Sequence, residues 1–181
     1  MPNYDPNNIF AKILRGELPS YKVYEDDKAI AFLDIMPRSP GHTLVLPKAP
    51  ARNILDIDAD DLAHVMMTAQ KIAKAAMKAF SADGITIQQF NEGAGGQVVF
   101  HLHVHVIPRK AGVVMKPPAS EKEKPEVLAE HAKALAAAIA GDLEAVDRVE
   151  LASLVRIQLQ TLGHEVIEQI LGVLGHRCHR G

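Results

Sequence analysis

A strict alternation of histidine and apolar residues in the second half of the chain limits its possible folds most. Residues 101–107 read His-Leu-His-Val-His-Val-Ile. Because the side chains of a β-strand point alternately to its two faces, the pattern predicts a strand over 98–107 with three imidazoles on one face. The opposite face, made by Leu102, Val104 and Val106, would pack in a core.

Three neighbouring imidazoles allow three interpretations. Ordinary half-exposed histidines would repel one another once protonated, and clusters of ionisable groups are more typical of functional sites. A His-x-His pair on a strand can chelate a metal ion, but a distant aspartate would have to complete the site. The third interpretation is a nucleophile beside an anion, because the glycine-rich residues 93–97 lead directly into the strand and their N–H groups could cradle a phosphate.

The residues around this strand predict an α+β domain. Apolar residues recur at three- and four-residue spacing over 59–80, which predicts a long helix, and a two-turn helix follows Asn7 or Asn8. Since helices do not alternate strictly with strands, we expect a five-stranded, mostly antiparallel sheet with two helices. Short apolar runs between turn residues predict the other strands, over 22–25, 29–34, 43–46 and 85–90.

Composition excludes several classes of protein. The chain has 181 residues with 20 Lys and Arg against 22 Asp and Glu, so its net charge of −2 provides no general attraction to nucleic acid or to an anionic membrane. The single cysteine, Cys178, can form neither an intrachain disulfide nor a thiolate zinc site. No apolar run is long enough to span a membrane, and we expect a cytoplasmic protein.

The last third of the chain differs in character from the rest. A polar, proline-containing stretch over 113–126 predicts a linker between a domain at 1–112 and a helical C-terminal extension at 127–181. Apolar residues in this extension draw a stripe that we expect to dock on the same domain or on a partner subunit. The stripe consists of Leu151, Leu154, Val155, Leu162, Val166, Ile170, Val173 and Leu174.

The histidine strand and its approach carry a family resemblance. Residues 91–109, Asn-Glu-Gly-Ala-Gly-Gly-Gln-Val-Val-Phe-His-Leu-His-Val-His-Val-Ile-Pro-Arg, resemble the signature of the histidine-triad (HIT) superfamily, which contains Hint- and Fhit-like nucleotide hydrolases and transferases. Three upstream segments, at 9–13, 31–34 and 40–48, resemble the family's other motifs, so the resemblance covers about 7–112. It implies a HIT-type fold and a homodimer whose sheet continues across the interface.

The resemblance also implies roles for individual residues. His103 would attack the α-phosphorus of a purine nucleotide and form a nucleotidyl-histidine, from which water releases a nucleoside monophosphate. His101, His105 and His42 would orient the ring and donate hydrogen bonds to phosphoryl oxygens. Further neutral donors would come from Gln97 and Asn91. Asp34 would bind the ribose hydroxyls, and the base would lie among apolar residues that could equally be ordinary core: Ile9, Phe10, Ile13, Leu18, Phe32 and Ile35.

Two departures from the family pattern affect the expected chemistry. Many members hold a structural zinc at positions that correspond here to Asn8, Ala11 and Pro50, none of which is a zinc ligand, so we predict no metal and no cofactor. Where phosphoramidases of the Hint type carry a hydroxyl residue that assists the leaving group, this chain has Val98, which argues against efficient phosphoramidase turnover.

The expected substrates are nucleoside phosphoramidates or dinucleoside polyphosphates. The alternative is a nucleotide-binding regulatory module with only incidental hydrolysis, since binding and turnover would use the same residues.

Overall fold

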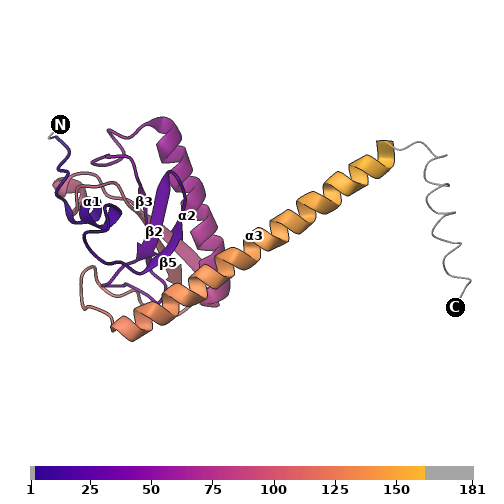
Figure 1. Ribbon diagram of the computed structural model, residues 1–181. Coiled ribbons are helices and arrows are strands. Elements are labelled where there is room, and N and C mark those ends of the chain that lie inside the picture. Colours follow the sequence, from indigo (N-terminus) through magenta and orange to yellow (C-terminus); the bar gives the residue numbers. More distant parts are fainter. Residues whose placement is uncertain (1–2, 162–181) are drawn as a thin grey trace, which may run out of the picture. The chain divides into compact units, whose positions relative to one another are not determined.

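The computed structural model describes residues 3–161 of the chain (Figure 1). The chain divides into two compact units, residues 1–140 and 141–181, which are described separately. The first unit contains a five-stranded antiparallel sheet in the order β1-β2-β3-β5-β4. Its strands are β1 (Lys22–Glu25), β2 (Ala29–Leu33), β3 (Thr43–Pro47), β4 (Gly84–Gln88) and β5 (Val104–Arg109).

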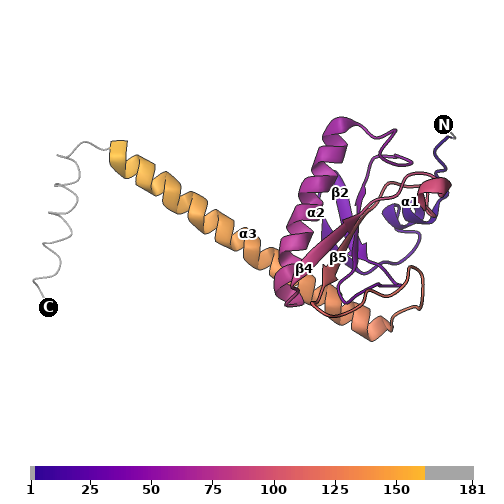
Figure 2. The same ribbon diagram turned by 180° about the vertical axis from the view of Figure 1, so that it is seen from behind.

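Helices cover both faces of this sheet. Figures 1 and 2 show the sheet between α1 (Ile9–Leu14) on one side and α2 (Ala59–Ala79) on the other. Asn8 begins α1 because its Oδ1 accepts hydrogen bonds from the N–H groups of Phe10 and Ala11, at 3.0 and 2.9 Å. Asp58 caps α2 in the same way through the N–H of Asp60. The α+β class, the five strands and these two helices were all predicted from the sequence.

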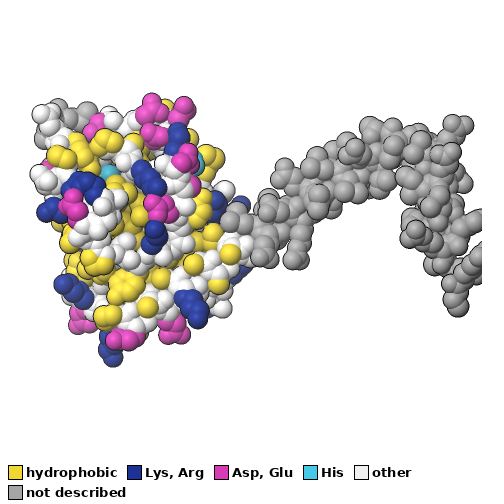
Figure 3. Space-filling view, viewed as in Figure 1, with side chains coloured by type: hydrophobic (Ala, Val, Ile, Leu, Met, Phe, Trp, Pro, Cys, Tyr) yellow, Lys and Arg dark blue, Asp and Glu magenta, His cyan; other side chains and the backbone are white. Residues whose placement is uncertain are grey.

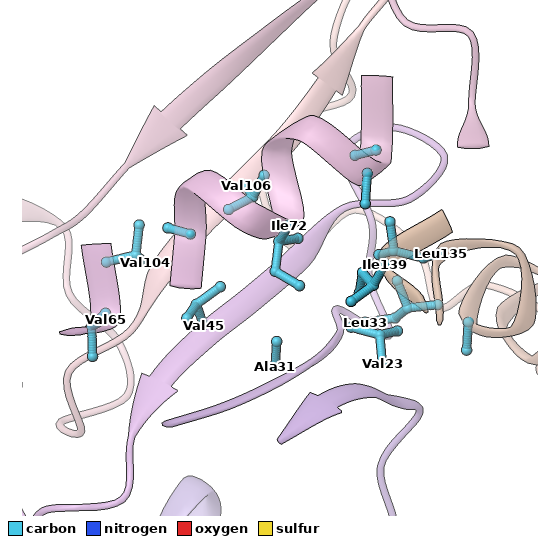
Figure 4. Packing of buried hydrophobic residues seen from close by; sticks show 14 of the residues in the cluster. Val23, Ala31, Leu33, Val45, Val65, Ile72, Val104, Val106, Leu135 and Ile139 are labelled. Atoms are coloured by element: carbon cyan, nitrogen blue, oxygen red, sulfur yellow. The ribbon is translucent and has the colours of Figure 1, made fainter. Parts of the chain in front are cut away.

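The main core lies between the sheet and α2. Side chains from β2, β3 and β5 meet those of Val65 and Ile72 on α2, all of them buried (Figure 4). The alternation in the histidine strand is confirmed on this side, because Val104 and Val106 point into this core. A second, smaller cluster on the opposite face contains Phe10 from α1. Its other buried members are Ile30, Phe32, Leu44 and Leu46.

The strand over 98–107 was predicted with the wrong limits. It begins at Val104 and ends at Arg109, and residues 99–101 before it form a bend rather than part of the strand. The N–H of Leu102 donates to the carbonyl oxygen of Ala51 at 2.8 Å. Residues 98–103 alternate like a strand, but β3 provides no partner for them, since its pairing with β5 ends at Val45 opposite Val104.

The third helix, α3 (Pro125–Thr161), begins within the first unit. Its buried residues Leu128, Ala132, Leu135 and Ile139 belong to the main core, so the compact unit extends to Ala140 rather than ending at 112. The preceding segment, expected to be a linker, bonds to the turn after β2. The N–H of Lys116 donates to the Arg38 carbonyl at 3.0 Å, and that of Glu123 to the Ile35 carbonyl at 2.9 Å.

Helical structure in the C-terminal extension is confirmed as far as Thr161. The apolar stripe predicted there falls on side chains outside the described part of the chain, and it stays a prediction. Among the described residues, no helix combines the length and apolar character needed to cross a membrane. Figure 3 shows acidic and basic side chains interspersed over one face of the first unit, without a continuous patch of either sign.

Candidate active site

His103 lies directly before β5, and its ring is held by a backbone carbonyl group two residues earlier in the chain. Its Nδ1 is 2.7 Å from the carbonyl oxygen of His101. A carbonyl oxygen can only accept, so Nδ1 carries the proton and Nε2 keeps its lone pair in the neutral ring. Within the described part of the chain no buried side-chain nitrogen or oxygen lacks a partner, and Nε2 of His103 has none, so this atom reaches solvent. A fixed imidazole with one free nitrogen is the arrangement that a nucleophile needs.

His42 and His105 form a second, connected pair. Nε2 of His42 is 2.9 Å from Nδ1 of His105, and the backbone N–H of Arg38 donates to Nδ1 of His42 at 3.2 Å. A neutral His42 that accepts at Nδ1 must be protonated at Nε2, which then donates to His105. His105 is therefore protonated at Nε2, the atom without a protein partner. This relay of hydrogen bonds, from the N–H of Arg38 through His42 to His105, ends in an N–H donor beside His103. The ring centroids of His103 and His105 are 5.0 Å apart.

Burial keeps this pair neutral. Desolvation, together with the positive charge of Arg38, lowers the pKa of His42 to about 4. Desolvation is also the largest cause that lowers the pKa of His105 to about 3. Burial lowers the pKa of His103 as well. All three rings are thus neutral at pH 7, as the tautomer assignments require.

The ring of His101 does not join the other imidazoles. It is completely buried, Nε2 lies 2.9 Å from the carbonyl oxygen of Pro47, and Nδ1 lies 2.6 Å from the hydroxyl oxygen of Tyr4. Burial lowers its pKa to about 4. Both ring nitrogens are used within the protein, so His101 contributes to the site through its carbonyl group rather than through its ring.

Asp34 follows β2 and faces the same region. Its Oδ1 accepts a hydrogen bond from the N–H of Met36 at 2.9 Å, and its Oδ2 lies 3.5 Å from Nδ1 of His42. Burial raises the pKa of this carboxyl. Because only Oδ1 accepts a backbone hydrogen bond, Oδ2 remains available to accept one from a ligand hydroxyl.

The predicted base-binding residues fall into two groups. Phe10 and Phe32 are buried, and the ring centroid of Phe10 lies 5.0 Å from that of His103 and 5.7 Å from that of Phe32. These two, with the partly buried Ile13, belong to the smaller core. The others keep 37–49% of their surface exposed and so offer apolar area to a ligand: Ile9, Leu18 and Ile35.

Gln97 lies at the end of the glycine-rich loop, where its amide is fully engaged. Nε2 donates to the carbonyl oxygens of Arg52 and Val99 at 2.7 and 3.0 Å, while Oε1 accepts from the backbone N–H of Glu92 at 2.8 Å. In this conformation Gln97 fixes the loop and has no N–H left for a phosphate. Asn91 likewise bonds within the protein, accepting from the N–H of Ile54 at 3.1 Å.

A partly buried polar network beside this loop was missed from the sequence. Nε and Nη2 of Arg52 each lie 2.7 Å from a carboxylate oxygen of Glu92, and the guanidinium lies 3.8 Å from the ring centroid of Phe100. The amide of Asn53 donates to the same carboxylate at 2.8 Å. Glu92 itself has a φ of 60°, a left-handed conformation that these bonds hold. No local pattern marks these residues, because the partners are some 40 positions apart in the chain.

Two groups of described residues bring three metal-ligand atoms within 4.8 Å of one another. In the first, Asp34, His42 and His105, the facing nitrogens of the histidines are already hydrogen-bonded to each other. In the second, Oδ2 of Asp26 bonds His64 at 2.9 Å, and Asp27 completes the group. The family's zinc positions carry three residues that are not zinc ligands: Asn8, which caps α1, the buried Ala11 and the exposed Pro50. The prediction of a metal-free protein remains a prediction.

A cavity of about 230 Å³ lies at the far end of β5, and none of the histidines lines it. Three of the four cationic side chains at its edge already bond neutral groups of the protein. Arg38 bonds Gln88, Arg109 bonds Thr86, and Lys110 bonds the carbonyl oxygen of Ser81. The cavity is therefore separate from the histidine cluster.

Comparison with known proteins agrees with this geometry. Residues 15–112, more than half of the chain, match the family model of the HIT domain. The chain belongs to the HIT family. Within the matched range lie the four histidines at or next to the candidate site, His42, His101, His103 and His105, and the HIT fold is the architecture of the first unit.

Solved HIT structures resemble this one closely. A HIT-like protein of Bartonella henselae, described as involved in cell-cycle regulation, shares 55% identity and a TM-score of 0.73, covering 76% of this chain and 99% of that one. A hypothetical histidine triad nucleotide-binding protein of Sulfolobus tokodaii shares 35% identity and a TM-score of 0.67, covering 73% and 91%. The adenylylsulfatase HINT3 of Arabidopsis thaliana is 39% identical over 102 residues, which are 56% of this chain and 52% of the relative.

Proposed function

We propose that this HIT protein is a nucleotide hydrolase or nucleotidyl transferase that acts at the α-phosphorus through a nucleotidyl-histidine. The observation that carries the proposal is the state of His103, a residue 7% exposed, with Nδ1 bound to a carbonyl at 2.7 Å and Nε2 without a protein partner. The name of the Arabidopsis relative, an adenylylsulfatase, supports hydrolysis at a nucleotide. That of the Sulfolobus relative supports nucleotide binding.

In the first step, the Nε2 lone pair of His103 attacks the α-phosphorus. A P–N bond forms while the bond from phosphorus to the leaving group breaks, and the electron pair departs with the leaving group. The positive charge that the ring acquires is stabilised by the hydrogen bond from Nδ1–H to the carbonyl oxygen of His101. The Nε2–H of His105, at the end of the relay, donates to a phosphoryl oxygen.

In the second step, water attacks the same phosphorus. Its proton passes to solvent, the P–N bond breaks, and the lone pair returns to Nε2 of His103. The products are a nucleoside monophosphate and the free enzyme. Transfer to another acceptor would follow the same course with a hydroxyl group in place of water.

The side chains around His103 would accommodate a nucleoside. Asp34 would accept hydrogen bonds from the ribose hydroxyls, and the exposed Ile9, Leu18 and Ile35 would contact a purine base above the buried Phe10. Proposed substrates are nucleoside phosphoramidates and dinucleoside polyphosphates. The side chain at position 98 is an exposed valine, which offers no proton to a leaving group and favours substrates whose leaving group departs unaided.

A homodimer with a continuous sheet is also proposed. β4 is an edge strand, because only β5 pairs with it, and its Ile87 keeps 43% of its surface exposed. Two neighbouring methionines on α2, Met66 and Met67, are 44% and 62% exposed. An unpaired strand edge, together with exposed apolar side chains, favours pairing with a second copy. Light scattering after size exclusion would test this, and a monomer at micromolar concentration would contradict it.

The experiment that tests the proposed function compares His103→Ala with His64→Ala across a panel of substrates. His64 lies outside the site and bonds Asp26, so its variant controls for the loss of an imidazole. We expect His103→Ala to lose at least ~10³-fold in kcat while it still binds nucleoside monophosphate, and His64→Ala to remain active. A wild-type protein that binds nucleotide without appreciable kcat on any substrate would instead indicate a regulatory binding module.

A further inference from the structure

Tyr4 connects the N-terminal segment to the histidine cluster. It precedes α1 and lies outside the residues that match the HIT family model. Its hydroxyl oxygen is 2.6 Å from Nδ1 of His101, 97 positions away in the sequence. The two rings also meet edge to face, with centroids 5.6 Å apart. The hydrogen bond and the ring contact together fix the position of the His101 side chain from outside the sheet.

The direction of this hydrogen bond follows from the other side of the ring. The carbonyl oxygen of Pro47, 2.9 Å from Nε2 of His101, can only accept, so Nε2 carries the proton. Nδ1 of the neutral ring is then an acceptor, and the phenol of Tyr4 donates to it. The imidazole is held at both nitrogens, by Tyr4 on one side and by the end of β3 on the other.

The same residue supplies the acceptor for the nucleophile. The carbonyl oxygen of His101 receives Nδ1–H of His103, and the next peptide is fixed by the bond from the N–H of Leu102 to Ala51. Any rotation of the His101 side chain that moves its backbone would misdirect this carbonyl. The orientation and tautomer of His103 therefore depend on how firmly His101 is held.

We propose that Tyr4 is a positioning residue for catalysis, which holds His101 so that its carbonyl aligns His103 for attack. The inference rests on the proposed function of His103. Without the phenol, Nδ1 of His101 would be an unpaired acceptor in a completely buried ring, an arrangement that proteins avoid. The ring would turn to find another donor, and the backbone at 101 would follow.

Tyr4→Phe tests the proposal, because it removes one hydroxyl and keeps the ring. Tyr4 contributes to neither buried apolar cluster, so the variant is expected to fold. Tyr24→Phe is the matched control, since it removes a hydroxyl that bonds Asp26 at 2.9 Å, outside the site. The measurements are kcat and KM with a turned-over substrate, the melting temperature, and the ¹⁵N chemical shifts of the imidazoles.

We expect Tyr4→Phe to lower kcat about tenfold with KM changed by less than about twofold, as for a loss of alignment at the reacting centre. The ¹⁵N shifts of His101 and His103 should move away from their single-tautomer values, and Tyr24→Phe should change neither kcat nor these shifts. Unchanged kcat and unchanged shifts in Tyr4→Phe would overturn the proposal. So would equal losses of kcat in both variants in proportion to melting temperature, because these would make Tyr4 a purely structural contact.

The two proposals fail in different ways. If the wild-type protein turns over no substrate, the function proposed for His103 is wrong, while the ¹⁵N shifts still report whether Tyr4 sets the tautomer of His103. If the wild-type protein is active and Tyr4→Phe changes neither kcat nor the ¹⁵N shifts, the proposed function stands and the positioning role of Tyr4 is wrong.

Discussion

Acidification should destabilise the protein well above the pH at which carboxylates are protonated. His42 and His101 both have a pKa of about 4 in the folded protein, because burial disfavours the charged ring, against about 6.5 in an unfolded chain. Between these values the unfolded state binds more protons than the folded state, so stability is fully present above pH 6.5 and falls as the pH is lowered towards 4.

The size of the effect follows from the two pKa values. At pH 5 a group shifted from 6.5 to 4 costs roughly 2 kcal/mol of unfolding free energy relative to pH 7. His42 and His101 do not contact each other, so together they remove about 4 kcal/mol, a large part of a typical total of 5–15 kcal/mol. For a chain of this length the melting temperature should drop by roughly 10 °C.

Urea unfolding followed by circular dichroism at pH 7, 6 and 5 measures this directly. The variant His101→Gln removes one of the buried rings, so its unfolding free energy should fall by roughly 2 kcal/mol less than that of the wild type between pH 7 and 5, whatever its absolute stability. A wild-type unfolding free energy that is flat between pH 7 and 5 would refute the reasoning, since it would mean that the buried rings are already protonated or freely hydrated.

Four further predictions concern other parts of the structure. Gly41→Ala should destabilise the protein by more than ~2 kcal/mol, because Gly41 has a φ of 78° and a Cβ there would lie 2.2 Å from Phe80; Gly16→Ala, with a φ of 75° and open space, should cost only about 1 kcal/mol in a thermal melt. Arg52→Ala should raise KM severalfold by releasing Glu92 and the glycine-rich loop, whereas Arg15→Ala, which breaks an exposed pair with Glu17, should leave KM unchanged. Asp34→Asn should reduce the preference for ribonucleotides over 2′-deoxynucleotides about tenfold in kcat/KM, and an unaltered preference would separate Asp34 from the ribose. Metal analysis of tag-free protein should find far less than one zinc per chain, and stoichiometric zinc would reverse the prediction of a metal-free protein.

Local patterns predicted the framework of the fold. The three- and four-residue spacing from 59 placed α2 within one residue of its observed end at Ala79, because one face of that helix packs in the main core from Val65 to Ala76. The first three strands were also predicted within a residue. In these elements the local periodicity and the tertiary contacts require the same structure.

Errors arose where distant partners decide the structure. Residues 98–103 alternate like a strand, yet Leu102 bonds Ala51 rather than a neighbouring strand. His101 belongs to the family motif, but the ring bonds Tyr4 and Pro47, which no spacing in the sequence connects to it. The start of α3 packs into the main core because Leu135 and Ile139 lie beside Val23 and Leu33, more than 100 positions earlier in the chain (Figure 4).

The candidate site divides in the same way. The motif predicted His103 as the candidate nucleophile, and the structure shows that only one of its ring nitrogens is hydrogen-bonded within the protein. The motif could not indicate that the amide of Gln97 is fully hydrogen-bonded, since the partners of Gln97, Arg52, Asn53 and Glu92, come from two separate loops. The role of a polar side chain in a site depends on which of its hydrogen bonds the rest of the protein already uses.

The most direct test of the account is to trap the covalent intermediate. Wild-type protein is mixed with substrate, denatured within the turnover time at alkaline pH, where the P–N bond of a phosphoramidate persists, and digested for mass spectrometry. We predict a nucleoside monophosphate attached to the peptide that contains His103, fragmenting to place the group on that histidine, and no adduct in His103→Ala. A protein that turns over substrate rapidly without any adduct, or an adduct that persists in His103→Ala, would contradict the central claim.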